Sequence, residues 1–307
     1  MKHGLASRNS CRNPVLSRYV SLFVLLVIVF AACAVGELLL IASGAGVSLM
    51  DTKGIGQVSL FLIILPILVI FAIRRGGGPV AFVKPYLANI PRTLAGFGAM
   101  WLQAVILMII AYALLGLMGF VGWSSEAWAN LSGEIVRKTG VALLVVLVLA
   151  YTEEHIFRAF VFRHLRYNET PAVTIAALVV AAALFSVSHL ISYKDAWTFA
   201  EVASLLFGLF LLGALFIVTY VASGSLACAI GMHAGLLGFK VVLRRTDLLD
   251  YQPDVWWLGG SEDIRLAPIT WLLMILIGIF IWATRHHLRR HFYIEPAVAP
   301  LRPGERP

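Results

Sequence analysis

A long apolar stretch of the sequence is interrupted by four side chains that can carry charge. The segment YTEEHIFRAF, residues 151–160, contains two glutamates, a histidine and an arginine, and it follows the wholly apolar VALLVVLVLA at 141–150. A charged side chain at the centre of a bilayer costs about 3 kcal/mol on insertion scales, so a membrane helix rarely keeps one without a role. We therefore expect a functional site here, with a purely structural charge network as the alternative.

The spacing of these charges separates the two glutamates. Glu154 and Arg158 are four residues apart, so on a helix they share one face and the arginine can neutralise this carboxylate. Glu153 points roughly 140° away from Arg158 around an α-helix and is less directly compensated. A carboxylate in this position can accept a proton from a water molecule, which makes Glu153 the candidate general base.

Two histidines in other apolar segments could complete such a site. His189 in FSVSHL lies four residues after Phe185, and His233 in IGMHAGLLGF is near the middle of its apolar run among small residues. Either histidine alone is more typical of a core position than of a catalyst. A carboxylate and two imidazoles together are sufficient to activate a water molecule and to stabilise charge on a carbonyl oxygen. We therefore predict an internal cavity reached by Glu153, His189 and His233.

The composition indicates which elements must position these residues. The chain has 307 residues, of which 60% are apolar and only 13% are charged, so we expect a polytopic membrane protein. The predicted fold class is an all-α membrane bundle of about eight transmembrane helices. They are expected near 19–43, 57–73, 98–121, 138–162, 171–192, 198–221, 225–243 and 268–284.

The net charge of +8 falls in short clusters at the ends of the apolar segments. This distribution indicates membrane topology and argues against nucleic-acid binding. If the N-terminus is cytoplasmic, 15 of the 24 lysines and arginines lie on the cytoplasmic side, 7 lie on the other side, and Arg158 and Lys240 lie inside or near spans. We therefore predict a multi-pass protein of the plasma (inner) membrane with both termini in the cytoplasm.

We expect four regions along the chain. Residues 1–18 form a basic cytoplasmic tail, and 19–137 form transmembrane helices without motifs. Residues 138–285 form the catalytic transmembrane core, and 286–307 form a basic, proline-containing cytoplasmic tail that is largely unstructured. The run RHHLRRHF at 285–292 is expected to bind anionic lipid head groups and to fix the orientation of the chain.

We predict neither a metal ion nor another cofactor. One glutamate with two histidines is an acceptable zinc set, but the sequence has no HExxH motif, and EEHIF does not place two histidines one turn apart. The three cysteines, Cys11, Cys33 and Cys228, are widely spaced and form no CxxC pair. No phosphate-binding loop follows a strand.

Three motifs occur in an order and spacing that are known from one family. They are Glu153-Glu154-x-x-x-Arg158, Phe185-x-x-x-His189 and the later His233. The arrangement resembles the CAAX-protease and bacteriocin-processing family, glutamate-type intramembrane proteases that are also called Abi proteins. The likeness covers roughly residues 138–285. It implies metal-independent hydrolysis of a peptide bond in a membrane-associated protein or peptide.

The resemblance also implies a role for each motif residue. Glu153 would activate the attacking water, and His189 would position or polarise it. His233 would contribute to the oxyanion pocket. Glu154 and Arg158 would hold the geometry of the site.

One position departs from the family pattern. The third motif is usually His-x-x-x-Asn, and Leu237 stands at its last position here. Removing an oxyanion donor from other enzymes costs on the order of 100-fold or more in rate. Lys240 is a candidate substitute because it returns to the His233 face of the helix, although it could instead be a residue that snorkels from the helix end.

Two other function classes stay open. The first is a non-catalytic membrane binding or immunity protein of the same fold, for which Leu237 is the best support. The second is a transporter, which the absence of an internal repeat disfavours.

Straight spans also present a geometric difficulty, because His189 lies about seven residues, or ~10 Å, past the centre of its own span. Helix tilt or an irregular, re-entrant segment at 193–200 would be needed.

Overall fold

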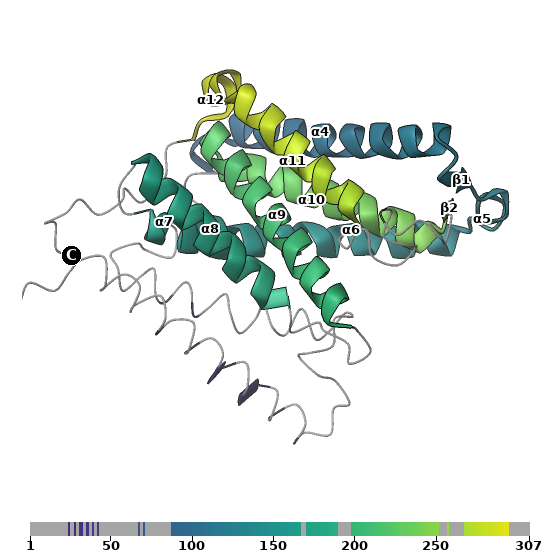
Figure 1. Cartoon of the computed structure of the whole chain (residues 1–307), viewed down its shortest axis with the longest axis horizontal. Helices are drawn as coiled ribbons and strands as arrows, with labels where there is room; N and C mark the ends of the chain where they lie inside the picture. The colour runs from purple at the N-terminus through teal and green to yellow at the C-terminus, as the bar shows by residue number, and fades with distance from the viewer. Residues whose placement is uncertain are drawn as a thin grey trace, which may run out of the picture.

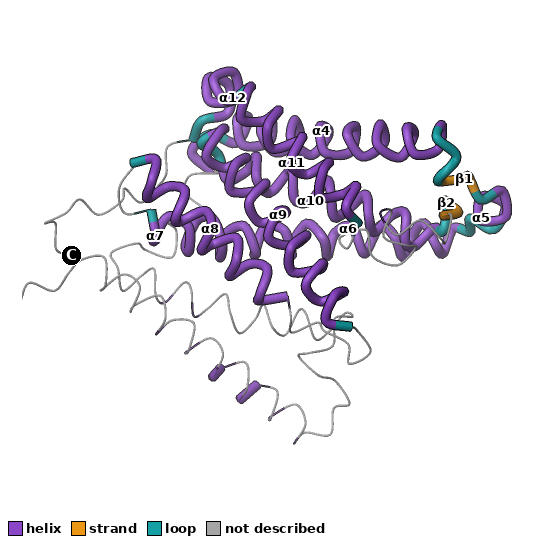
Figure 2. Tube along the Cα trace, viewed as in Figure 1, coloured by secondary structure: helices purple, strands orange, loops and turns teal. Residues whose placement is uncertain are grey.

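The computed structural model describes residues 87–166, 170–189, 198–251 and 267–294, together with Trp257 and a few isolated positions between residues 24 and 70. In this part the chain is mostly helical, with two short strands and short connecting loops, as Figure 2 shows. Five of the helices are long and apolar enough to cross a membrane, and a bent pair could form a sixth span. The predicted all-α membrane bundle is confirmed, whereas the first two predicted spans lie almost entirely outside the described residues.

Each of the other six predicted spans corresponds to a helix. In chain order the elements are α4 (Ile90–Leu117), β1 (Val121–Trp123), α5 (Ser125–Ala129), α6 (Gly133–Glu154), the π-helix η2 (His155–Phe162), α7 (Arg163–Leu165), α8 (Pro171–Ser188), α9 (Phe199–Ser223), α10 (Leu226–Thr246), β2 (Leu249–Tyr251), α11 (Pro268–Ala283) and α12 (Arg285–Phe292). The predicted ends are displaced by several residues. The largest differences are at α4, which begins at Ile90 and not at 98, and at α6, which begins at Gly133 and not at 138.

Local sequence signals set several helix ends. The side chain of Asn89 accepts a hydrogen bond from the backbone three residues on, and Pro91 follows in the first turn of α4, where its missing N–H is not needed. Thr198 and Glu201 form a reciprocal capping box at the start of α9. Gly224 ends α9 with a φ of 68°, a left-handed conformation that glycine adopts without steric cost. The chain can therefore reverse from α9 into α10 within a few residues.

The helix α10 lies inside the described bundle and packs against α4, α6 and α9. Of its apolar stretch 56% is buried within the protein, against 17% for α4. Gly231 and Gly235 face α4. A Cβ atom at Gly231 would fall on the carbonyl oxygen of Phe97, and one at Gly235 would lie 2.7 Å from the Cβ of Ala104. Such close backbone approach maximises van der Waals contact, a main source of helix association in lipid.

The helices cross one another at an angle that matters for the site. In Figure 1, α4 and α6 run nearly parallel, and α8, α9 and α11 are oblique to them. Helices α8 and α9 meet at Gly213, where a Cβ atom would lie 3.0 Å from the ring of Phe185 and 3.3 Å from the Cα of Ala182. Because α8 is oblique to the charged helix, the end of α8 can bring His189 close to it. This is the tilt that the sequence analysis expected to be necessary.

The two ends of the bundle differ. At one end β1 and β2 pair in antiparallel fashion, with Val121 opposite Tyr251. This pair was not predicted, because strands of three residues are too short to show a periodic pattern. At the other end α12 is bent by 67° from α11. The prediction of an unstructured tail is wrong as far as Phe292, because Leu288 and Phe292, one helical turn apart, pack against the bundle.

The contact between α4 and α10 gives a first prediction. Gly231→Ala should lower the free energy of unfolding in detergent by about 1–3 kcal/mol, because the added methyl group must displace the Phe97 carbonyl. Gly98→Ala on α4 is the control, since a Cβ atom there meets nothing within 4 Å. That variant should keep its stability or gain slightly, because alanine favours helix more than glycine does. Equal losses in the two variants would contradict a tight α4–α10 contact.

Candidate active site

A buried ion pair lies where α6 continues into the π-helix. The side chains of Glu154 and Arg158 are fully buried, and Nη1 of Arg158 lies 3.1 Å from Oε1 of Glu154. The other terminal nitrogen of Arg158, Nη2, donates a hydrogen bond of 3.0 Å to the backbone carbonyl of Gly213 on α9. The pairing expected from the four-residue spacing is therefore present, and it also connects the charged helix to α9.

Aromatic rings enclose the guanidinium group of Arg158. Its Cζ atom lies 4.7 Å from the ring centroid of Phe185 on α8 and 5.0 Å from that of Phe216 on α9. The face of an aromatic ring attracts a cation, and more strongly where water is absent. Arg158 therefore connects the π-helix to α8 through the Phe185 ring, and to α9 through the Phe216 ring and the Gly213 carbonyl.

His233 joins this cluster from α10. Its Nδ1 lies 2.8 Å from Oε1 of Glu154, and its ring stacks on Phe216 with centroids 4.3 Å apart and planes inclined by 17°. Because an ionised carboxylate can only accept a hydrogen bond, the partner assigns the proton to Nδ1 of His233. The second nitrogen, Nε2, then faces Oε2 of Glu153 at 3.8 Å.

His189 reaches the same carboxylate from the end of α8. Its Nδ1 donates a hydrogen bond of 2.8 Å to the backbone carbonyl of Phe185, and its Nε2 lies 4.0 Å from Oε1 of Glu153. Both distances from Nε2 to the Glu153 carboxylate exceed a direct hydrogen bond, and a gap of this size suits a bridging water molecule. The structure thus brings Glu153, His189 and His233 together from three helices.

The three side chains differ in exposure. The exposed fraction is 24% for His189, 14% for Glu153 and 4% for His233. Glu154, the next residue along the helix, is not exposed at all. The two adjacent glutamates therefore differ in accessibility. Solvent can reach the Glu153 carboxylate, whereas the Glu154 carboxylate is enclosed by its partners.

Residues 135–237 match the family model described as Rce1-like, type II CAAX prenyl endopeptidase Rce1-like. This stretch of the chain is Rce1-like. It contains every motif residue described above, so the resemblance drawn from the three motifs is confirmed, although the predicted likeness continued to residue 285. No curated protein and no solved structure matches the chain.

The charged helix of the Rce1-like stretch changes its winding at the site. It is α-helical to Glu154 and a π-helix from His155 to Phe162. The uniform α-helix assumed in the sequence analysis is therefore wrong beyond Glu154. Segments of π-helix are rare and are frequent at functional sites. This one contains Arg158 and the buried His155, whose Nδ1 donates a hydrogen bond of 2.7 Å to the carbonyl of Tyr151.

Two of the predicted residues follow His233 on α10. Leu237 lies one turn further along and Lys240 about two turns further, and both are partly buried. Leu237 is the last residue of the Rce1-like match, and Lys240 lies beyond it. The part of either residue in an oxyanion pocket stays a prediction.

The sequence analysis did not single out Gly213 or Phe216. Both lie in the apolar run LLGALF, where a phenylalanine is an ordinary core residue. Gly213 carried the only local signal, because a glycine inside a helix costs about 1 kcal/mol relative to alanine and so indicates a close approach. Here its carbonyl accepts from Arg158, and its missing side chain makes room for the Phe185 ring.

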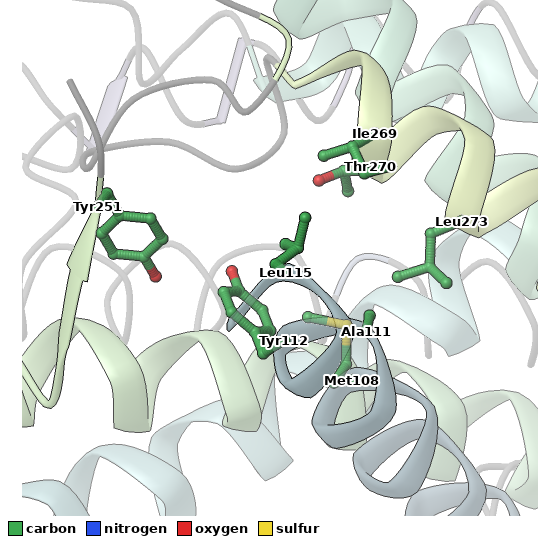
Figure 3. Close-up of a pocket in the computed structure, with 8 residues that line it drawn as sticks. All are labelled: Met108, Ala111, Tyr112, Leu115, Tyr251, Ile269, Thr270 and Leu273. Carbon is green, nitrogen blue, oxygen red and sulfur yellow. The ribbon is translucent and has the colours of Figure 1, made fainter. Parts of the chain in front are cut away.

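A small hollow of about 30 Å³ lies away from these residues, between α4, β2 and α11 (Figure 3). It is lined by Met108, Ala111, Tyr112, Leu115, Tyr251, Ile269, Thr270 and Leu273. Burial raises the pKa of Tyr251 on β2, so its hydroxyl stays protonated. None of the motif residues lines this hollow, and the cavity predicted beside Glu153 stays a prediction.

The fit of a metal ion can be tested on the donor set. In the part of the chain that the structure describes, no group of three histidine, cysteine, aspartate or glutamate side chains could hold a metal ion. The Nδ1 atoms of His189 and His233 are both occupied as hydrogen-bond donors. The expected independence from metal stays a prediction, which a chelator can test.

The buried ion pair gives a second prediction. Arg158→Leu should lower the free energy of unfolding by about 3–5 kcal/mol, because it leaves the enclosed Glu154 charge without its cation. Adding Glu154→Gln should recover part of this loss, measured as a double-mutant cycle in detergent.

The exposed pair Glu134–Lys138 on the same helix is the matched control. It has the same four-residue spacing and a distance of 2.9 Å, but both side chains are more than half exposed (62% for Glu134 and 58% for Lys138). Lys138→Leu should therefore cost less than about 1 kcal/mol. Losses of similar size at Lys138 and Arg158 would contradict the structural role assigned to the buried pair.

Proposed function

We propose that this chain is a glutamate-type intramembrane endopeptidase that hydrolyses a peptide bond of a membrane-associated protein or peptide without a metal ion. The observation that carries the proposal is the position of the Glu153 carboxylate, which faces Nε2 of His233 at 3.8 Å and Nε2 of His189 at 4.0 Å. The match to the Rce1-like family supports an endopeptidase, and the assignment of roles to single residues is our inference.

The proton positions inferred for the two rings indicate how a water molecule would be held. Because Nδ1 of His189 donates to a backbone carbonyl, the Nε2 of the neutral ring is an acceptor. The Glu153 carboxylate is an acceptor as well. A water molecule between them can donate one hydrogen to each, which leaves an oxygen lone pair for attack on a substrate carbonyl.

The reaction then needs two proton transfers. As the water oxygen bonds to the carbonyl carbon, one water proton passes to Glu153 and the carbonyl oxygen becomes an oxyanion. In its protonated form His233 would donate from Nε2 to this oxyanion, and Glu154 would balance its charge through Nδ1. Glu153 then gives its proton to the leaving nitrogen as the carbon–nitrogen bond breaks, so the carboxylate is restored and one water molecule is consumed.

The substrate and the membrane are also part of the proposal. The family name refers to a CAAX prenyl endopeptidase, so prenylated CAAX-type peptides are one substrate class, and unmodified membrane peptides are the other. We place the chain in the plasma (inner) membrane with both termini cytoplasmic. The excess of basic residues on the predicted cytoplasmic side supports this orientation.

The test compares wild type with Glu153→Gln on a peptide library that contains both substrate classes, with cleavage measured by mass spectrometry. The variant should lose at least about 100-fold in kcat/KM, because glutamine cannot accept the water proton. Glu134→Gln, an exposed glutamate earlier on the same helix, is the control and should keep full activity. Cleavage should continue when a chelator is present.

Two results would contradict this proposal. Loss of cleavage on chelation would assign the chemistry to a metal ion. Peptide retained without cleavage, equally by wild type and Glu153→Gln, would favour the non-catalytic membrane binding protein, for which the absence of the usual asparagine at Leu237 is the specific support.

A further prediction concerns the missing amide at position 237. Leu237→Asn places a hydrogen-bond donor one turn from His233, so kcat should rise, by up to about 100-fold if the oxyanion lacks a donor. Leu237→Ala removes the same apolar side chain without adding a donor and should not raise kcat. A similar rise in both variants would show that space at this position, and not hydrogen bonding, limits the rate.

A further inference from the structure

The helix α12 has one face inside the protein and one face outside. It turns by 67° from α11 and therefore does not follow the axis of that helix. Leu288 is buried, with 5% of its surface exposed, and Phe292 packs against the same core. His286 and Arg290 are one turn apart on the opposite side of the helix, and both are exposed.

Hydrogen bonds hold α12 in this orientation. Nη2 of Arg289 donates to the carbonyl of Val221 at 2.9 Å, which satisfies a carbonyl in the last turn of α9. The backbone N–H of Ile294 donates to the carbonyl of Gly224 at 3.3 Å. Nη1 of Arg285 donates to the carbonyl of Trp282 at 2.9 Å, and its guanidinium lies 5.0 Å from the centre of that indole ring. The outer face of α12 is therefore presented by a fixed helix.

This end of the described bundle is strongly basic. Arg92 at the start of α4 contacts the carbonyl of Tyr293 through Nη1 at 3.4 Å. The last turn of the charged helix lies here as well, since the ring of Phe162 meets that of Tyr220 edge-on at 6.2 Å. The arginines at this end are Arg92, Arg163, Arg166, Arg285, Arg289 and Arg290. Among the described residues, no aspartate or glutamate accompanies them, because the acidic ones lie in the site or at the opposite end.

We propose that the outer face of α12, with Arg290 at its centre, binds the head groups of anionic phospholipids in the leaflet beside it. Three observations favour lipid over a soluble anion. The helix begins where the apolar α11 ends, it does not follow the axis of that helix, and Trp282 beside Arg285 is 48% exposed, which suits a membrane–water interface. Arginines near an anionic surface each add measurably to binding. The proposal does not depend on the proposed function.

The test uses the full chain in detergent, titrated with phosphatidylglycerol or phosphatidylcholine, with bound lipid counted by native mass spectrometry. Phosphatidylglycerol should bind at least about tenfold more tightly than phosphatidylcholine. Arg290→Gln should weaken phosphatidylglycerol binding about fivefold. Arg137→Gln is the matched control, because Arg137 is an exposed arginine at the opposite end, near the start of α6, and its loss should leave binding unchanged.

Several outcomes would overturn the proposal. They are equal affinity for the two lipids, an equal effect of Arg137→Gln and Arg290→Gln, and displacement of phosphatidylglycerol by millimolar inorganic phosphate, which would assign the face to a free anion. Thermal unfolding of both variants guards against a folding defect. Because Arg290 is exposed, its substitution should leave the unfolding temperature unchanged, and a weaker binding that accompanies a lower unfolding temperature would count against the proposal.

Discussion

A carboxylate enclosed in a membrane protein needs a compensating charge, and the arrangement around Glu154 follows from that need. Its Oε1 lies 3.1 Å from Nη1 of Arg158 and 2.8 Å from Nδ1 of His233. Arg158 in turn requires partners, which are the Gly213 carbonyl and the faces of two aromatic rings. Side chains and backbone from α6, the π-helix, α8, α9 and α10 thus converge around this ion pair. An uncompensated charge at this depth would cost several kcal/mol, so these helices are constrained to one mutual arrangement.

The same arrangement gives the two imidazoles different surroundings. Nδ1 of His233 donates to a carboxylate, whereas Nδ1 of His189 donates to an uncharged backbone carbonyl. In the proposed mechanism the two rings have matching tasks, since His233 donates to the developing oxyanion while neutral His189 accepts from the water. Identical side chains can therefore serve opposite functions on either side of Glu153.

The parts of this structure that the sequence predicted are those with a local signal. Long apolar runs located the spans, the four-residue spacing of Glu154 and Arg158 predicted their pairing, and the order of three motifs indicated the Rce1-like family. The meeting of His189 with Glu153 depends on the oblique crossing of α8, which no local pattern records. Phe216 looked like any core aromatic residue, because only its neighbours from other helices give it a role. The π-helix and the three-residue strands likewise leave no periodic signature.

The turn between α9 and α10 is closed by residues that come much later in the chain. Gly224 adopts a left-handed conformation against the ring of Tyr293, which leaves no room for a side chain at this position. The carbonyl of Gly224 accepts a hydrogen bond from the backbone N–H of Ile294. The hairpin that this turn closes carries Phe216 and His233. The hairpin that carries His233 is therefore covered at its turn by residues that follow α12, so the two helices of the hairpin and the end of the described chain form one packed unit.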